Sequence, residues 1–304
     1  MGFGAKVVAD SVSPAGVRLT TLEVTMPRII LAEFNTHRML SRNSASSRAI
    51  PVEKRIAMVE ADPFVPEAFG RNQQGMQAGE ALDGEEAEAA RENWMSACRS
   101  AVAHARSAAQ LGVHKQLANR LIEPFLWHTV LVTATEWSNF FALRCNPDAQ
   151  PEIRRVAELM REAMASSEPL PFNYGEWHTP FVEPAEAFDL LVEGMTWRDA
   201  CKVSIGRCAR VSYLTHDGRR APEEDVKLAD RLSTSGHMSP FEHVARPFAS
   251  FLDKADRYCP RTGRPFVGNF AGWVQYRKGI ANEDDFAEHL IASAAANAMV
   301  EGAS

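Results

Sequence analysis

Fifteen consecutive residues, from Phe34 to Arg48, contain a dense set of hydrogen-bond donors. The arginines, the histidine and the hydroxyl side chains of this run are Arg38, Arg42, Arg48, His37, Thr36, Ser41, Ser44, Ser46 and Ser47. A forked guanidinium group matches the geometry of phosphate oxygens, so this composition favours an anionic ligand. A solvated loop is the competing interpretation, but the run directly follows an apolar segment, residues 28–34. Polar side chains that follow a buried element indicate a binding site.

The elements expected to position this run lie immediately before it. Residues 5–8 and 17–25 alternate apolar and polar side chains, which predicts two strands joined by a turn at residues 13–16. Residues 28–34 fit either a short strand or the first turns of a helix. Pro27 stands at the first helical position, which favours the helix.

The rest of the chain is predicted to alternate helices with a few strands. Helices are expected near residues 83–110, 113–122, 136–144, 150–165, 196–213, 225–234 and 285–294, and strands at 125–133 and 244–252. Loops rich in proline, glycine or polar residues occupy 62–82, a segment suited to closing over a ligand, and 167–185. The second loop gives a boundary between a nucleotide- and flavin-binding part, residues 1–185, and the remainder of the same fold, residues 186–304.

Composition excludes several classes of protein. The chain has 304 residues, 45% of them hydrophobic, and a net charge of −6, so its basic residues are local and it is not a general binder of nucleic acid. The five cysteines are scattered, and they predict neither a disulfide framework nor a metal site. The first residues lack a signal peptide, and no run of residues is long and apolar enough to cross a bilayer. We therefore expect a cytoplasmic protein.

The donor-rich run resembles the signature of the flavin-dependent thymidylate synthase family, R-H-R-x7-S. Thr36, His37 and Arg38 stand at the first three positions, and Ser46 stands at the last. The histidine, the second arginine, the spacing and the serine fit, whereas the first arginine is replaced by Thr36. Asn43 and Arg48 also match the wider pattern of that family.

Two further stretches carry the same resemblance. Residues 133–153 match the family segment N-x-R-x-x-x-N-F-x-x-x-R-x-x-x-x-A-Q-x-E-I, and residues 119–124 are similar to A-R-x-x-L-P. Residues 209–213 and 236–243, A-R-V-S-Y and G-H-M-S-P-F-E-H, resemble motifs that precede the signature in the family. Here these two motifs come last, which indicates a circularly permuted order. We therefore predict that residues 237–242 fold back against residues 37–48, in one subunit or across an interface.

The resemblance implies a fold, an activity and a set of site residues. The implied fold is α/β (α+β), with a mixed or antiparallel sheet, long helices and assembly as a homotetramer. The implied reaction is transfer of a one-carbon unit from methylenetetrahydrofolate to C5 of a pyrimidine deoxynucleotide monophosphate, dUMP to dTMP by default, with FAD as cofactor and NADPH as reductant. The implied FAD-binding residues are His37, Arg38, Asn43, Asn139, Ser212, His237, Ser239 and Glu242.

The implied nucleotide site combines a base edge and a phosphate. Arg144 matches the arginine that stabilises the N3-deprotonated base, and Ser46 lies against the nucleotide; these two are the candidate catalytic residues. Substrate binding is implied for Glu33, Thr36, Ser44, Ser46, Ser47, Arg48, Arg120 and Arg144, with Arg48 and Arg120 at the 5′-phosphate. No metal ion is implied.

Departures from the family pattern leave alternatives open. Thr36, Glu33, Ser44, Thr133 and Asp148 replace the family residues at their positions. In the family, the first three of these positions line the nucleotide. Two alternatives to the default reaction therefore stay open: the chain acts as a hydroxymethylase, or it acts on cytosine, whose amino group can donate to a glutamate. An inactive relative that binds nucleotides or nucleic acid is the alternative of another class.

Structural roles compete with the functional ones for single residues. His237 after Gly236 is typical of a helix cap, and Ser239 with Glu242 is typical of a capping box. Asn139 fits an exposed helix position, and Arg144 fits a partner of a helix C-terminus. The functional interpretation depends on three separated stretches that point to one family.

Overall fold

The computed structural model describes residues 2–211, 221–255, 257–258, 263–280 and 283. Its centre is a mixed five-stranded sheet in the order β3-β4-β2-β1-β5, in which β1 and β5 are parallel and the other pairs are antiparallel. The predicted fold class, α/β with a mixed sheet and long helices, is confirmed. The strands are β1 (Gly4–Val12), β2 (Arg18–Pro27), β3 (Ser41–Ser44), β4 (Trp127–Ala134) and β5 (Leu170–Pro171).

The two central strands of the sheet bury side chains on both faces. In β2 and β4, Leu22 pairs with Val132 and Val24 with Val130, and these side chains point to one core. Leu131 points to the opposite face and belongs to a second buried cluster. Alternation with a period of two therefore supplies both faces of the sheet with apolar surface.

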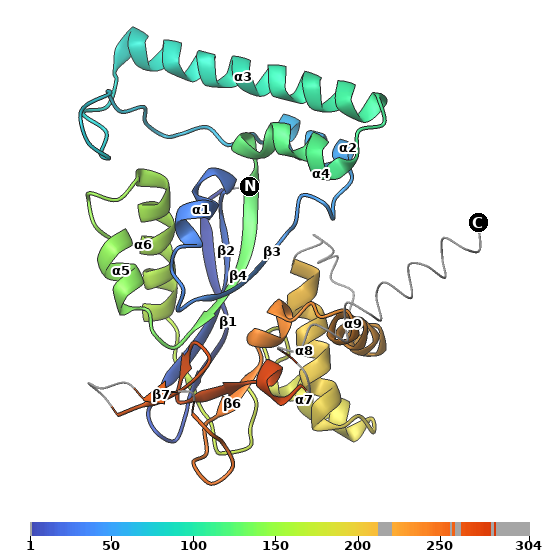
Figure 1. The fold of residues 1–304 in the computed structure, drawn as a ribbon. Coiled ribbons are helices and arrows are strands. Elements are labelled where there is room, and N and C mark those ends of the chain that lie inside the picture. The colour runs from blue at the N-terminus through green and yellow to red at the C-terminus, as the bar shows by residue number, and fades with distance from the viewer. Residues whose placement is uncertain (1, 212–220, 256, 259–262, 281–282, 284–304) are drawn as a thin grey trace.

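Helices cover these two faces from opposite sides (Figure 1). On one side α6 packs through Ile153, Val156 and Met160 against β1 and β2, with α5 beside it. On the other side, Cys208 and Val211 of α8 pack against Leu131. The bounds are α5 (Ser138–Arg144), α6 (Pro151–Ala165), α7 (Pro184–Val192), α8 (Trp197–Val211) and α9 (Pro222–Thr234).

A further layer lies across one end of the sheet and is seen at the top of Figure 1. The long helix α3 buries Cys98, Val102 and Ala105 on one face, as its sequence predicts, against α2 and η2. The Trp94 indole N–H donates to the carbonyl of Phe64, which ties the loop before α3 to this layer. The bounds are α2 (Val52–Ala61), α3 (Gly84–Gln110), α4 (Lys115–Ala118) and the 3-10 helix η2 (Asn119–Phe125).

The last part of the chain packs back on the first strands. Val17 and Leu19 share a buried cluster with Phe270 and Trp273, and the Trp273 indole donates to the Val17 carbonyl at 3.0 Å. The two parts of the chain therefore share core residues. The elements involved are η3 (Ser239–Glu242), β6 (Ala245–Pro247), β7 (Arg257–Tyr258), β8 (Pro265–Val267), β9 (Phe270–Ala271), β10 (Trp273–Gln275) and η4 (Tyr276–Gly279).

Several local predictions need correction. Residues 28–34 are helical, as η1 (Arg28–Ile30) and α1 (Leu31–Phe34), so the strand alternative is wrong. The strand expected at 244–252 is confined to Ala245–Pro247, because the Asp253 carboxylate accepts the Ala249 N–H at 2.9 Å and turns the chain. The helix expected at 285–294 lies outside the described residues. Within the described ranges, no helix combines the length and apolar character that a bilayer crossing needs.

Candidate active site

The donor-rich run becomes an edge strand of the sheet. β3 pairs with β4, and its side chains alternate, so that Ser41 and Asn43 are buried while Arg42 and Ser44 are half-buried. Nη1 of Arg42 donates to the carbonyls of Phe34, Asn35 and His37, the last at 2.8 Å. These bonds close the loop between α1 and β3, so Arg42 shapes the signature segment.

His37 and Arg144 meet although they lie far apart in the sequence. Nε of Arg144, at the end of α5, donates to Nε2 of His37 at 2.8 Å, and the imidazole packs edge-on against Phe140. Burial, then Arg144 and then Arg42, lower the pKa of His37 to about 4. His37 is therefore neutral at physiological pH, and its Nε2 accepts the hydrogen bond from the guanidinium N–H while Nδ1 carries the ring proton.

Asn43 connects the signature segment to the last part of the chain. Its Nδ2 donates to the carbonyl of Cys208 on α8 at 2.8 Å, and its Oδ1 accepts from the Ser239 hydroxyl at 3.3 Å. The prediction that residues 237–242 fold back against residues 37–48 is confirmed, within a single chain. The expected capping box is not formed, because the Ser239 hydroxyl bonds to Asn43 and caps no helix.

Glu242 adds the one carboxylate that the resemblance assigns to this side of the site. It accepts from Nη1 of Arg277 at 2.6 Å. The pKa of Arg42 is lowered by burial and by Arg38, and Glu242 opposes that shift. Glu242 therefore interacts electrostatically with Arg42, and Arg38 itself is exposed.

His237, by contrast, forms part of a helix cap. Gly236 has a φ of 73°, a left-handed conformation that suits glycine, and the His237 N–H donates to the carbonyl of Leu232 at the end of α9. The imidazole is exposed and its Nδ1 hydrogen-bonds to Ser235. The capping role that the sequence suggested is present, and an exposed ring still leaves Nε2 accessible. Asn139 is exposed on α5, and Ser212 lies outside the described residues.

The three departures near the signature have distinct positions. The Thr36 hydroxyl donates to the Glu33 carbonyl at 2.6 Å and so closes the turn after α1. Oε2 of Glu33 is buried and has no hydrogen-bond partner among the described residues. Ser44 is half-buried at the end of β3. Of the three residues, Glu33 is the one with a buried oxygen that lacks a hydrogen-bond partner among the described residues, which favours a ligand group at this position.

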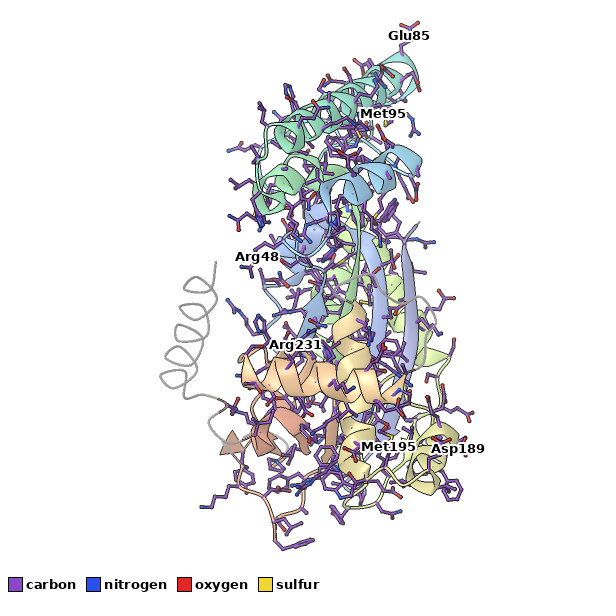
Figure 2. The ribbon with its side chains drawn as sticks, turned by 90° about the vertical axis from the view of Figure 1, so that its right-hand side faces the viewer. Arg48, Glu85, Met95, Asp189, Met195 and Arg231 are labelled. Atoms are coloured by element: carbon purple, nitrogen blue, oxygen red, sulfur yellow. The ribbon has the colours of Figure 1, made fainter. Side chains whose placement is uncertain are left out.

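Of the two arginines that the resemblance implies at the phosphate, Arg120 lines a pocket of about 450 Å³. Its Nη1 donates to the carboxylate of Glu123 at 3.0 Å. The Ser47 hydroxyl also donates to Glu123, while the Ser46 hydroxyl accepts the backbone N–H of Arg48 at 3.3 Å. Figure 2 shows Arg48 at a height between α3 and α9. Arg48 is exposed, so its guanidinium is accessible to solutes.

Four residues of this pocket region were not among the site residues predicted from the sequence: Arg28, Arg55, Glu123 and His128. Arg28 donates to Glu123 at 3.1 Å, and its Nη1 lies 3.1 and 3.2 Å from the two ring nitrogens of His128. One signal was present in the sequence, since Glu123 stands where the family motif A-R-x-x-L-P has leucine. The other three belong to no motif, and only the fold brings them together.

The described cysteines do not favour a thiolate nucleophile. Burial raises the pKa of Cys98, Cys145, Cys201 and Cys208, and it does so most for the last two. A raised pKa keeps each thiol protonated at neutral pH and hence weakly nucleophilic. The arrangement is suited to a reaction that needs no cysteine.

Comparison with known proteins identifies the family of the chain. The family described as thymidylate synthase complementing protein matches residues 11–170, more than half of the chain. The chain therefore belongs to the thymidylate synthase complementing protein family. It is a methyltransferase, and membership supports flavin-dependent chemistry at C5 of a pyrimidine.

Two similar solved structures are of a UMP/dUMP methylase PolB from Streptomyces cacaoi. One is bound with 5-Br UMP, is 17% identical and aligns with a TM-score of 0.46 over 54% of this chain and 89% of that chain. The other is bound with 5-Br dUMP, is also 17% identical and aligns with a TM-score of 0.45 over 54% of this chain and 90% of that one. No curated protein sequence matches the chain.

Proposed function

We propose that the protein transfers a one-carbon unit from methylenetetrahydrofolate to C5 of a pyrimidine deoxynucleotide, with dUMP to dTMP as the default reaction. The observation that carries this proposal is the hydrogen bond from Arg144 to His37. It places the arginine implied at the base edge against the signature segment implied for the flavin. Two sites that must be adjacent for hydride transfer are thereby joined.

The residues present fit FAD. An anionic, hydrogen-bonding cofactor needs cationic and polar groups that remain accessible, and Arg38, Ser239 and His237 are exposed. Asn43 holds Ser239 in place, and Glu242 interacts electrostatically with Arg42. Bound and reduced, FAD would supply the hydride of the reaction. His37, Arg38, Asn43 and Ser239 are the residues of this chain that would hold it.

Arg144 activates the base. A permanently charged guanidinium beside an acidic N–H favours the deprotonated form, as any close cation does. Nε of Arg144 is held by His37, and neither Nη group has a hydrogen-bond partner among the described residues. The Nη groups are thus available for the base. Because His37 is neutral, it positions the guanidinium without adding a competing positive charge.

A second candidate substrate is a cytosine nucleotide, and Glu33 favours it. Its buried Oε2 lacks a partner among the described residues, and a carboxylate oxygen accepts the exocyclic amine of cytosine. Hydroxymethylation in place of methylation is the corresponding alternative product. An inactive, nucleotide-binding relative is the alternative outside the enzymes.

The experiment that tests the function uses the whole chain with FAD, methylenetetrahydrofolate and NADPH, and supplies dUMP and dCMP separately. We expect flavin absorbance in the purified protein, and methylated or hydroxymethylated product from one of the two nucleotides. Mass spectrometry distinguishes the two products. A flavin-bound protein inactive on both nucleotides would support the inactive relative, and a colourless protein would contradict the flavin site.

The arrangement of the whole chain belongs to this proposal. We infer that residues 186–304 complete, in permuted order, the flavin site begun by residues 1–185. The contacts of Asn43 with Cys208 and Ser239 support this division, because they join both parts. Assembly as a tetramer is the state implied by the family, and size-exclusion chromatography with light scattering measures it.

A further inference from the structure

The pocket lined by Arg28, Arg120 and Glu123 has an unusual charge arrangement. Two arginines flank one carboxylate, Arg28 with a side chain 10% exposed and Arg120 with a side chain 58% exposed, whereas that of Glu123 is 18% exposed. The rest of the lining includes apolar side chains of η1, α1 and η2. The pocket is therefore an open, cationic recess in which a single acidic group receives the donors.

A third arginine lies behind this lining. Arg55 is 2% exposed, and its Nε and Nη2 have no hydrogen-bond partner among the described residues. Burial, then Arg28, lower the pKa of Arg55 to about 10, so it stays charged at neutral pH. Burial, then Arg28 and Arg55, lower the pKa of His128 to about 3, so His128 is neutral. The guanidinium groups of Arg28 and Arg120 therefore contact the carboxylate of Glu123, and the guanidinium of Arg55 interacts with it electrostatically.

Glu123 takes the very donors that a phosphate would use. It accepts from the Ser47 hydroxyl, from Arg28 at 3.1 Å and from Arg120 at 3.0 Å. Ser47 and Arg120 are two of the residues implied for the 5′-phosphate. The family motif has leucine at this position, which carries no charge. The Glu123 carboxylate therefore accepts the hydrogen bonds that a phosphate group would accept in this pocket.

We propose that Glu123 is an internal counterion of this pocket, which the 5′-phosphate of a nucleotide displaces from Arg28 and Arg120. The proposal rests on the proposed function in that the phosphate belongs to the nucleotide substrate. Arg28 then becomes a phosphate ligand outside every family motif. Glu123 occupies the donors of the pocket in the free protein and is the residue that weakens nucleotide binding.

The balance of charge explains why the exchange is feasible. Three guanidinium groups and the Glu123 carboxylate together leave an excess of two positive charges. A phosphomonoester dianion neutralises that excess, which Glu123 by itself leaves unbalanced. A dianion also offers more acceptor oxygens, which can reach buried donors such as those of Arg55. Against this, Glu123 remains nearby after displacement and repels the dianion, because like charges in a partly buried site interact strongly.

The test compares wild-type protein with E123Q by isothermal titration calorimetry, using inorganic phosphate, dUMP and deoxyuridine as probes. Glutamine keeps an acceptor for Ser47 but removes the charge. We expect E123Q to bind phosphate and dUMP about tenfold more tightly than wild type, with deoxyuridine binding unchanged. The matched control is E60Q, which removes the carboxylate of the exposed Glu60–Arg106 ion pair and should change none of the three affinities.

A double variant and the unmodified protein make the result decisive. R28Q/E123Q should lose the gain in phosphate affinity, because Arg28 is the displaced partner. In wild-type protein, phosphate should shift the NMR signals of the His128 imidazole, which lies against Arg28. A folded E123Q whose affinity for phosphate is equal to or weaker than that of wild type overturns the proposal, as does phosphate that leaves His128 unchanged.

Neither assay requires flavin or turnover. A protein that passes these tests and yet makes no product from dUMP or dCMP contradicts the proposed function and leaves the role of Glu123 intact. A protein that turns over dUMP but shows no gain in E123Q contradicts the role of Glu123 alone.

Discussion

At the scale of single residues, the contact between Arg144 and His37 sets the protonation of the site. Burial is the largest cause of the low pKa of His37, and Arg144 is the next. The guanidinium thereby keeps Nε2 unprotonated and able to accept. The two side chains form a mutually dependent pair, because loss of either removes the partner of the other.

This dependence predicts the effect of R144Q. Removal of the neighbouring positive charge should raise the pKa of His37 from about 4 toward its ordinary value, which an NMR titration of the imidazole signals measures. Turnover should fall by about 100-fold or more, because a preorganised charge at the reacting base is lost. R154Q is the control: it breaks the Arg154–Glu158 pair on α6 and should leave His37 unchanged. A pKa that stays near 4 in R144Q would mean that burial and Arg42 suffice to hold the pKa of His37 low.

Residue chemistry explains which parts of the site the sequence could predict. Asn43 and Ser239 could be predicted to converge because their motifs identify them, and the structure brings them together. The role of Glu123 could not be predicted, because it depends on Arg28, which contacts Glu123 only in the folded chain. A carboxylate beside one arginine in the sequence is typical of an ordinary helix pair, and its second and third donors come from elsewhere.

At the scale of elements, the strand β3 shows why local pattern falls short. Residues 41–44 are Ser-Arg-Asn-Ser, a composition typical of a loop, yet they form a strand because β4 offers its edge. Strand propensity depends on available neighbours more than on the segment itself. The helices α3 and α6 were predictable to within a few residues, because they carry long amphipathic patterns that no tertiary contact is needed to reveal, whereas α2 and α7 were not predicted.

Two helices approach closely enough that a single methyl group should separate them. A Cβ added at Gly206 on α8 would lie 2.6 Å from the backbone oxygen of Asp225 on α9. G206A should therefore lower the free energy of unfolding by about 1–3 kcal/mol, as overpacking of a core does. Denaturant titration measures the change. G4A is the control, because a Cβ at Gly4 meets no atom within 4 Å. Equal stability of G206A and wild type would show that α9 can shift away.

A buried chain of hydrogen bonds connects the sheet to the last part of the protein. The Thr133 hydroxyl on β4 bonds to Thr21 at 2.7 Å and to Nδ1 of His243 at 2.8 Å, and Thr21 continues to His178 at 2.8 Å. All four residues are fully buried. Thr133 therefore links β2, β4 and the segment after η3 in one network, at a position where the family has asparagine.

T133V should destabilise the protein although it preserves side-chain shape. Valine leaves Thr21 and His243 short of a partner, and a buried polar group without a partner costs about 1–3 kcal/mol. The free energy of unfolding from denaturant titration is the measurement. T25V is the control, since the Thr25–Thr129 bond is longer, at 3.4 Å, and only partly buried. A smaller loss in T133V than in T25V would contradict the network.

At the scale of the whole molecule, the parts of the chain before and after residue 185 depend on a common core. Leu19 packs with Trp273, and Leu131 packs with Cys208 and Val211. The site has the same character, because Asn43 is held by Cys208 and Ser239. Loss of packing in either part therefore disturbs the site in the other. Local sequence patterns do not predict such coupling, because a proline-rich loop such as residues 167–185 indicates a boundary between two parts of the chain.

The buried histidines make the stability of the whole molecule depend on pH. The pKa is lowered to about 4 for His37 and to about 3 for His128, His178 and His243, in each case mainly by burial. The unfolded chain, with histidine near 6.5, therefore takes up these protons first. The stabilisation is complete above about pH 6.5 and is lost as the pH falls toward 3. Between about pH 6 and 4.5, each such histidine should contribute a slope approaching about 1.4 kcal/mol per pH unit.

Denaturant titrations at pH 7.5, 6.0 and 5.0 measure this dependence. H178Q removes one of the titrating groups and should reduce the slope by about 1 kcal/mol per pH unit, whatever its effect on stability at pH 7.5. H104Q alters an exposed histidine on α3 and should leave the slope as in wild type. A wild-type protein equally stable at pH 7.5 and 5.0 would show that these imidazoles gain protons without unfolding. Burial in the shared core would then not be what sets the pKa of these histidines, because they would take up protons equally in the folded and the unfolded chain.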